Sequence, residues 1–245
     1  MGNLTYDFRG RTAVVTGAAR GIGLEIARFF ARSGATVIAV DVDRDELESA
    51  VRPLGAVPVA GDVSRPQTAH EAVERAMTGT GRVDVLVNNA GVLRDAVVWK
   101  TSDEDWDLVL AVHAGGTFRM TRACIPVFRA QRYGRVINVT STSGVHGNFG
   151  QAAYATAKAG IIGFTKTVAR ETARFGVTVN ALLPNADTRM IESIPEDRRR
   201  EIAGSIPMGR FGDPAEMCAA VGFLASEEAG YVTGIVLPVD GGISM

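Results

Sequence analysis

Three side chains in the middle of the sequence have types and spacings that suit proton transfer. Tyr154 and Lys158 are four residues apart, so on a helix they lie on one face. A phenol has a pKa of about 10, and a nearby ammonium lowers it by favouring the phenolate. Ser141, thirteen residues before Tyr154, follows an apolar run and can hold a carbonyl or alcohol oxygen beside the phenol. Tyrosine and lysine also occur at this spacing by chance, so the interpretation depends on the rest of the chain.

A glycine-rich turn near the N-terminus has the composition of a phosphate-binding loop. Its glycines lie between an apolar run at 12–16 and an amphipathic segment. Their spacing is not the common G-x-G-x-x-G, but they permit a tight turn and let a pyrophosphate approach the N-terminus of the next helix. The alternative is a turn without a ligand. The dinucleotide interpretation assigns contacts to Gly17, Arg20, Gly21, Ile22 and Gly23.

Asp41 ends the second apolar run, about twenty residues after the glycines. A carboxylate there can accept hydrogen bonds from the adenosine ribose hydroxyls and repels a 2′-phosphate. Arg20 argues the other way, because an arginine can pair with that phosphate. We predict NAD as the cofactor, with NADP possible, and the alternative role for Asp41 is a helix N-cap.

Short apolar runs alternate with amphipathic segments along the whole chain, which is typical of a parallel sheet covered on both faces. We predict one α/β domain over 1–245, a doubly wound, seven-stranded Rossmann fold with right-handed crossovers. Residues 184–212 are predicted to be irregular and to form a substrate lid. Strands are expected at 12–16, 36–40, 57–60, 83–87, 135–140, 177–183 and 235–239. Helices are expected at about 21–32, 43–53, 66–79 and 103–132. A further helix carries Tyr154 and ends at about 175, and another begins at 214.

The composition excludes several classes of function. With 245 residues, 46% of them hydrophobic, the chain can bury a sizeable core, and a net charge of −1 gives no field that would attract nucleic acid or an anionic membrane. No apolar run approaches the length of a membrane span, and the N-terminus lacks a signal-peptide core. Cys124 and Cys218 are far apart, and the three histidines form no ligand cluster, so we expect a cytoplasmic protein without a metal site.

The motifs TGAARGIG, GDV, NNAG, a serine with Y-x-x-x-K, and VTGIVLPVDGG together resemble the short-chain dehydrogenase/reductase family over essentially the whole chain. The resemblance implies a homotetramer assembled through two long helices. It implies that Tyr154 is the acid/base, that Lys158 binds the nicotinamide ribose and tunes the tyrosine, and that Ser141 positions the substrate oxygen. It further implies cofactor contacts by Asp62, Val63, Asn89 and Thr188.

His113 departs from the family pattern. Seven residues after Trp106, relatives usually have an asparagine that helps to hold a water between the lysine and solvent. A histidine there is either a structural residue or a proton relay, because imidazole titrates near neutrality. Since Ser141, Tyr154 and Lys158 are present, the substitution does not predict an inactive enzyme.

Further segments, among them HGNFGQAAYATAK and LPNADTRM, resemble (3R)-hydroxyacyl-CoA dehydrogenase domains, and GNFGQAAYATAKAG also resembles 3-oxoacyl-acyl-carrier-protein reductases. The resemblance implies an oxidoreductase that interconverts 3-hydroxyacyl and 3-oxoacyl thioesters, with Ser143, Asn148 and Gln151 facing the substrate. One alternative is a relative that acts on another secondary alcohol or ketone, such as a steroid or a sugar. The other is a dinucleotide-binding sensor without catalytic activity.

Overall fold

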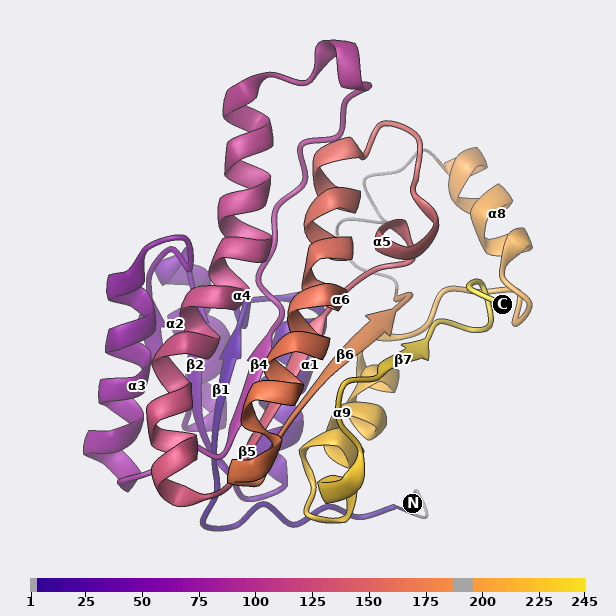
Figure 1. The fold of residues 1–245 in the computed structure, drawn as a ribbon. Coiled ribbons are helices and arrows are strands. Elements are labelled where there is room, and N and C mark those ends of the chain that lie inside the picture. Colours follow the sequence, from indigo (N-terminus) through magenta and orange to yellow (C-terminus); the bar gives the residue numbers. More distant parts are fainter. Residues whose placement is uncertain (1–3, 187–195) are drawn as a thin grey trace.

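A seven-stranded sheet forms the centre of the protein (Figure 1). The computed structural model describes residues 4–186 and 196–245. The strands are β1 (Thr12–Thr16), β2 (Thr36–Asp41), β3 (Val57–Ala60), β4 (Val85–Asn88), β5 (Gly134–Val139), β6 (Val177–Pro184) and β7 (Val236–Val239).

All strand pairs are parallel, in the order β3-β2-β1-β4-β5-β6-β7. The predicted α/β fold class with a doubly wound parallel sheet is therefore confirmed. The order reverses between β1 and β4, from which the chain continues in opposite directions across the sheet. In sheets of this kind, ligands bind outside the carboxyl ends of the strands at such a reversal.

Helices cover both faces of the sheet (Figure 1). One face carries α1 (Gly21–Arg32), α2 (Arg44–Val51) and α9 (Met217–Ala225), and the other carries α3 (Pro66–Thr80), α4 (Asp103–Gln131) and α6 (Ala152–Thr172). The remaining helical segments are short: α5 (Ser143–His146), α8 (Glu196–Ser205), and the 3₁₀ turns η1 (Arg52–Leu54), η2 (Val98–Lys100), η3 (Ala173–Phe175), η4 (Pro214–Glu216) and η5 (Glu228–Tyr231).

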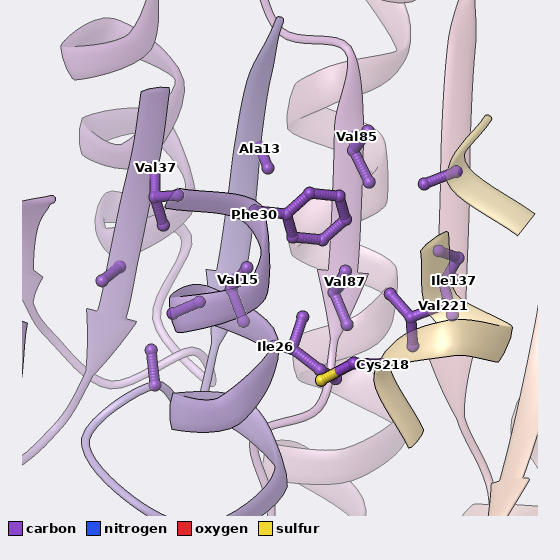
Figure 2. Packing of buried hydrophobic residues seen from close by; sticks show 14 of the residues in the cluster. Ala13, Val15, Ile26, Phe30, Val37, Val85, Val87, Ile137, Cys218 and Val221 are labelled. Atoms are coloured by element: carbon purple, nitrogen blue, oxygen red, sulfur yellow. The ribbon is translucent and has the colours of Figure 1, made fainter. Parts of the chain in front are cut away.

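The apolar runs of the strands are continuous because successive side chains enter two different cores. Ala13 and Val15 of β1 face the core beneath α1, α2 and α9, whereas Val14 between them faces the core beneath α3, α4 and α6. Figure 2 shows the first core, where the fully buried Phe30 of α1 lies against the sheet. Fully burying a side chain of this size contributes on the order of 1.5–3 kcal/mol, so the two cores hold the sheet as a fixed platform.

The prediction that 184–212 is irregular is wrong for part of its length, because α8 lies within it. Its sequence is nearly all polar and has no apolar face, so hydrophobic periodicity could not reveal it. Ion pairs between residues three or four apart support the helix instead, among them Arg198 with Glu201 and Arg200 with Asp197. Within the described ranges, no helix is both long and apolar enough to cross a membrane.

Candidate active site

The carboxyl edge of β1, β4 and β5 brings together segments that are far apart in the sequence. β1 leads into the glycine turn, β4 into Asn89, and β5 into Ser141. The helices α4 and α6 lie side by side and extend past this edge (Figure 1). Parallel strands place their carboxyl ends together, so the fold itself gathers most of the residues that the sequence singled out.

The glycine turn needs glycine for two reasons. Gly17 has φ +68°, a left-handed conformation that side chains with a Cβ rarely adopt. A Cβ on Gly23 would clash with the carbonyl of Gly17. α1 then begins without a side-chain cap or an acidic residue in its first turn. Its first backbone N–H groups and the positive end of its dipole suit an anion, as a pyrophosphate site requires.

Asn89 joins the end of β4 to this turn. Its Nδ2 donates to the carbonyl of Thr16 at 3.0 Å and of Gly17 at 3.3 Å, and its backbone N–H donates to the Thr16 hydroxyl at 3.0 Å. The asparagine side chain therefore fixes the shape of the glycine turn. Its expected contact with the adenosine stays a prediction.

Asp41 supports the same turn from β2. Its Oδ2 accepts from the N–H of Ala19 at 3.0 Å and its Oδ1 from the N–H of Asp43 at 3.2 Å. The alternative role of Asp41 as a helix N-cap is wrong, because Asp43 caps α2 by accepting from the N–H of Glu46 at 3.2 Å. Asp41 lies at the end of β2, and Arg20 of the glycine turn is paired with Asp43 and Glu46.

Asp62 and Val63 form the turn after β3. The Oδ1 of Asp62 accepts from the N–H of Ser64 at 2.7 Å, and its carbonyl accepts from the hydroxyl of Thr68 at 2.8 Å. Val63 is buried against Gly116 of α4, where a Cβ would meet its methyl group. These contacts fix the turn at the edge of the sheet, where the predicted adenine contacts would be made.

Ser141, Tyr154 and Lys158 converge as their spacing predicts. α6 places Tyr154 and Lys158 one turn apart, with the Lys158 Nζ 5.6 Å from the centre of the tyrosine ring. The hydroxyl of Ser141 lies near enough to that of Tyr154 to lower the pKa of the phenol. Lys158 is buried, and its Nζ donates to the carbonyl of Val139 at 2.7 Å. The two hydroxyls can therefore meet on a single oxygen atom, with an amine one helical turn away.

Burial dominates the proton affinities of this group. Desolvation raises the pKa of Tyr154, and Asp95 raises it further, while the hydrogen bond from Ser141 lowers it. The expectation that a nearby ammonium lowers the pKa of Tyr154 does not hold here, because burial raises that pKa. Burial also lowers the pKa of Lys158 to about 7, which weakens its ammonium form near neutral pH. The environment thus favours a neutral, protonated tyrosine.

His113 projects from α4 onto Tyr154, with the ring centres 5.1 Å apart and the planes perpendicular. Its Nε2 lies 2.8 Å from the carbonyl of Val92 and 3.1 Å from the N–H of the same residue. We assign the hydrogen to Nε2 because the contact with the carbonyl is shorter. Gly91 approaches the ring so closely that a Cβ there would clash with it. His113 therefore anchors the loop after β4.

The imidazole of His113 is held neutral. Burial and the nearby Lys158 lower its pKa to about 3, despite the hydrogen bond with Val92. The Nδ1 atom is buried and has no hydrogen-bond partner among the described residues. A relay that takes up a proton near pH 7 is not compatible with this environment, so the geometry favours the structural role of His113.

The three predicted substrate residues form one hydrogen-bonded group. The Oε1 of Gln151 accepts from the Ser143 hydroxyl at 2.8 Å and from the Asn148 Nδ2 at 3.0 Å. The Nε2 of Gln151 donates to the Oδ2 of Asp95 at 2.8 Å. Sequence reasoning missed Asp95, because it lies far from Gln151 in the chain and only the bridge between Ala96 and Gln151 brings the two loops together.

Thr188 and most of the first half of the predicted lid lie outside the described residues. In the rest of the chain, no group of His, Cys, Asp or Glu side chains has the geometry of a metal site.

Comparisons with known proteins agree with these features. Residues 17–244 match the family described as Enoyl-(Acyl carrier protein) reductase. The chain is 43% identical to the 3-oxoacyl-[acyl-carrier-protein] reductase FabG of Thermotoga maritima, over 96% of this chain and 98% of that protein. It is 42% identical to the protein of the same name from Vibrio cholerae and 40% identical to that from Escherichia coli, each over 98% of this chain and 99% of the relative.

Proposed function

The chain belongs to the short-chain dehydrogenase/reductase family, and we propose that it interconverts 3-oxoacyl and 3-hydroxyacyl thioesters by NAD(P)-dependent hydride transfer. The relatives named above support the substrate class, because the chain matches them over almost its full length. An acyl thioester of acyl carrier protein or coenzyme A is the proposed substrate. The alternative is another secondary alcohol or ketone, since the fold is shared by many substrates.

The approach of the Ser141 hydroxyl to that of Tyr154 on α6 is the observation that carries this proposal. Two hydroxyls that reach a single point can bind one carbonyl oxygen from two sides. The family description names an enoyl reductase, whose reducible bond joins two carbons. A pair of oxygen-directed hydroxyls fits the reduction of a ketone better, as the names of the curated relatives also do.

In this mechanism Tyr154 acts as the general acid for reduction. Its raised pKa keeps the phenol protonated, so it can donate its proton to the ketone oxygen while Ser141 holds that oxygen in place. Lys158 then stabilises the phenolate that forms, one helical turn away. When bound by the glycine turn, a nicotinamide dinucleotide would supply the hydride for the carbonyl carbon. In the opposite direction, the tyrosine phenolate accepts the hydroxyl proton.

His113 has a positioning role in this proposal. Its neutral ring packs perpendicular to the ring of Tyr154 and holds Val92 by hydrogen bonding. The group formed by Ser143, Asn148, Gln151 and Asp95 lies on the segments that flank Ser141 and Tyr154 and would contact the substrate beyond its reacting carbonyl. Residues 184–212 remain the proposed lid, and 1–245 remain the proposed single domain.

NAD is the proposed cofactor in preference to NADP. The carboxylate of Asp41 lies at the end of β2, and the basic residue of the glycine turn, Arg20, is paired with two acids. Binding would involve the glycine turn together with Asp62, Val63, Asn89 and Thr188. The same carboxylate repels a 2′-phosphate.

The proposed assembly is a homotetramer. Phe118 of α4 is 43% exposed and lies edge-on to Phe164 of α6, so the outer surface of these two long helices carries an aromatic pair. Light scattering of the purified protein tests this state. A cytoplasmic location is also proposed, in keeping with the unpaired, buried thiols of Cys124 and Cys218.

The deciding experiment measures turnover with acetoacetyl-CoA, with acetoacetyl-acyl carrier protein, and with a panel of steroid, sugar and simple ketones. We expect kcat/KM for the thioesters to exceed that for every other ketone by at least about a hundredfold, since the enzyme discriminates through differences in transition-state binding. A steroid or sugar that matches the thioesters would favour the alternative substrate class. Nucleotide binding without turnover of any ketone would identify a sensor.

A further inference from the structure

Arg20 is the basic side chain of the glycine turn, and two acids of the neighbouring helix hold it. One of its terminal nitrogens lies 3.1 Å from the Oδ2 of Asp43 and 2.6 Å from the Oε2 of Glu46. Asp43 is the N-cap of α2, and Glu46 lies in its first turn. The Asp43 carboxylate is therefore fixed by the start of the helix, and Glu46 lies within one turn of it. The guanidinium is directed toward α2.

We propose that Asp43 and Glu46 hold Arg20 away from a ribose 2′-phosphate, and so determine that the glycine turn selects NAD(H) over NADP(H). An arginine near the end of the second strand is the residue type that accommodates this phosphate in dinucleotide folds, and guanidinium binds phosphate with paired hydrogen bonds. Here one terminal nitrogen of the guanidinium is engaged by both carboxylates. A 2′-phosphate would have to displace them, and it would meet their negative charge. This inference rests on the proposed use of a nicotinamide dinucleotide.

Asp41 adds a third carboxylate, but in a different way. Its oxygens accept from the backbone N–H groups of Ala19 and Asp43, so it belongs to the scaffold of the turn. Asp43 and Glu46 act through the arginine instead. The charge of Asp41 and the pairing of Arg20 by Asp43 and Glu46 would thus oppose the 2′-phosphate separately. The pairing of Arg20 can be removed without changing Asp41.

The expected change in nucleotide selectivity follows from how exposed these three side chains are. The side chains of Arg20, Asp43 and Glu46 retain 44%, 43% and 26% of their accessible surface. Water and salt screen pairs as exposed as these, so each contributes modestly. We therefore expect release of Arg20 to change nucleotide selectivity about fivefold to twentyfold, and we expect the change to shrink in high salt.

The test compares the binding of ADP-ribose and 2′-phospho-ADP-ribose by calorimetry, which needs no turnover. The variant is Asp43→Asn with Glu46→Gln, where asparagine can still cap α2. We expect the ratio of the dissociation constants, phosphorylated over unphosphorylated, to fall about fivefold or more. Adding Arg20→Met to this variant should raise the ratio again, because the released guanidinium is then gone.

A matched control changes the same helix and the same net charge. Asp45→Asn with Glu48→Gln also removes two acids from α2, but the structure pairs Glu48 with Arg44. We expect this variant to keep the original ratio. An equal fall in the control, or no fall in the Asp43 and Glu46 variant, would overturn the inference. If the unmodified protein binds neither fragment, the proposed cofactor class fails, and this inference fails with it.

Discussion

At one end of the proposed site, Lys158 and His113 are 4% and 2% exposed; at the other end, the Arg20 and Asp43 side chains keep 44% and 43% of their surface. The buried residues, with Ser141 and Tyr154, form the proposed catalytic group. The exposed ones, with Asp41 and Glu46, form the Arg20 cluster. Both lie at the carboxyl edge of one sheet.

Because the two regions differ in burial, their charges are controlled in different ways. In the proposed catalytic group, desolvation moves the pKa of Lys158 to about 7 and that of His113 to about 3, so burial sets which groups carry charge. In the Arg20 cluster, charges stay near water and act on one another through a screened field. Substitutions in the first region should change chemistry and pH dependence, and substitutions in the second should change the choice of ligand.

The largest effect is expected from Tyr154→Phe. Removing the proposed proton donor should lower kcat at least about a hundredfold, because a positioned acid/base group contributes that much or more. The ring and its contact with His113 remain, so ADP-ribose binding should stay close to that of the unmodified protein. Steady-state rates and calorimetry check the two halves. A variant that keeps more than about a tenth of the original rate would remove Tyr154 from the mechanism.

Lys158→Met tests whether the amine of Lys158 is desolvated, through the pH dependence of the free energy of unfolding. The folded amine loses its proton near pH 7 and the unfolded one near pH 10.5, so between these values the unfolded state binds more protons. The free energy of unfolding of the unmodified protein should then rise with pH relative to the variant, by at most about 1.4 kcal/mol per pH unit. Urea unfolding at pH 7 and pH 9, without nucleotide, measures this. Parallel pH dependences would show that the amine is not desolvated.

His113→Leu should lower the free energy of unfolding by roughly 1–3 kcal/mol, because the carbonyl of Val92 loses its buried partner. His113→Asn, which keeps a polar side chain, should cost less and should retain activity within about threefold. Since the imidazole stays neutral above about pH 3, the pH profiles of kcat/KM should coincide between pH 5 and 8 for the asparagine variant and the unmodified protein. If His113→Asn removes an apparent pKa between pH 5 and 8, the interpretation of His113 as a proton relay would be supported.

The smallest effect is expected in the Arg20 cluster. Asp41→Asn removes the charge but keeps an oxygen that can accept from the Ala19 N–H. The preference for NAD(H) over NADP(H), measured as the ratio of kcat/KM values, should narrow by about fivefold and depend on salt. A clear NADP(H) preference in the unmodified protein would mean that Arg20 outweighs the surrounding acids. The Arg20 cluster would then not select NAD(H).

Much of this arrangement was predictable from the sequence. The alternation of apolar runs gave the sheet and its two helical layers, since strands buried on both faces are continuous in hydrophobicity. Spacing alone put Tyr154 and Lys158 on one face of a helix, and the position of Ser141 after a strand placed it beside them. Local sequence patterns predict the arrangement of side chains where one helix or strand carries several of them.

The parts that could not be predicted depend on contacts between distant segments. α8 is held by charge pairs, so a search for apolar periodicity passes over it. Asp95 meets Gln151 through a bridge between two loops. The pKa directions of Tyr154 and Lys158 depend on burial, which the spacing of residues does not specify.

The close approach of Gly91 to the ring of His113 has a consequence for how this protein can change over generations. A Cβ at position 91 would occupy the space of the imidazole, so the two positions do not vary independently. Any larger residue at 91 requires a smaller one at 113 first, and the order of the two replacements matters. A lineage that kept the histidine would hold the glycine as well, and one that exchanged the histidine for a smaller side chain would gain freedom in the loop after β4.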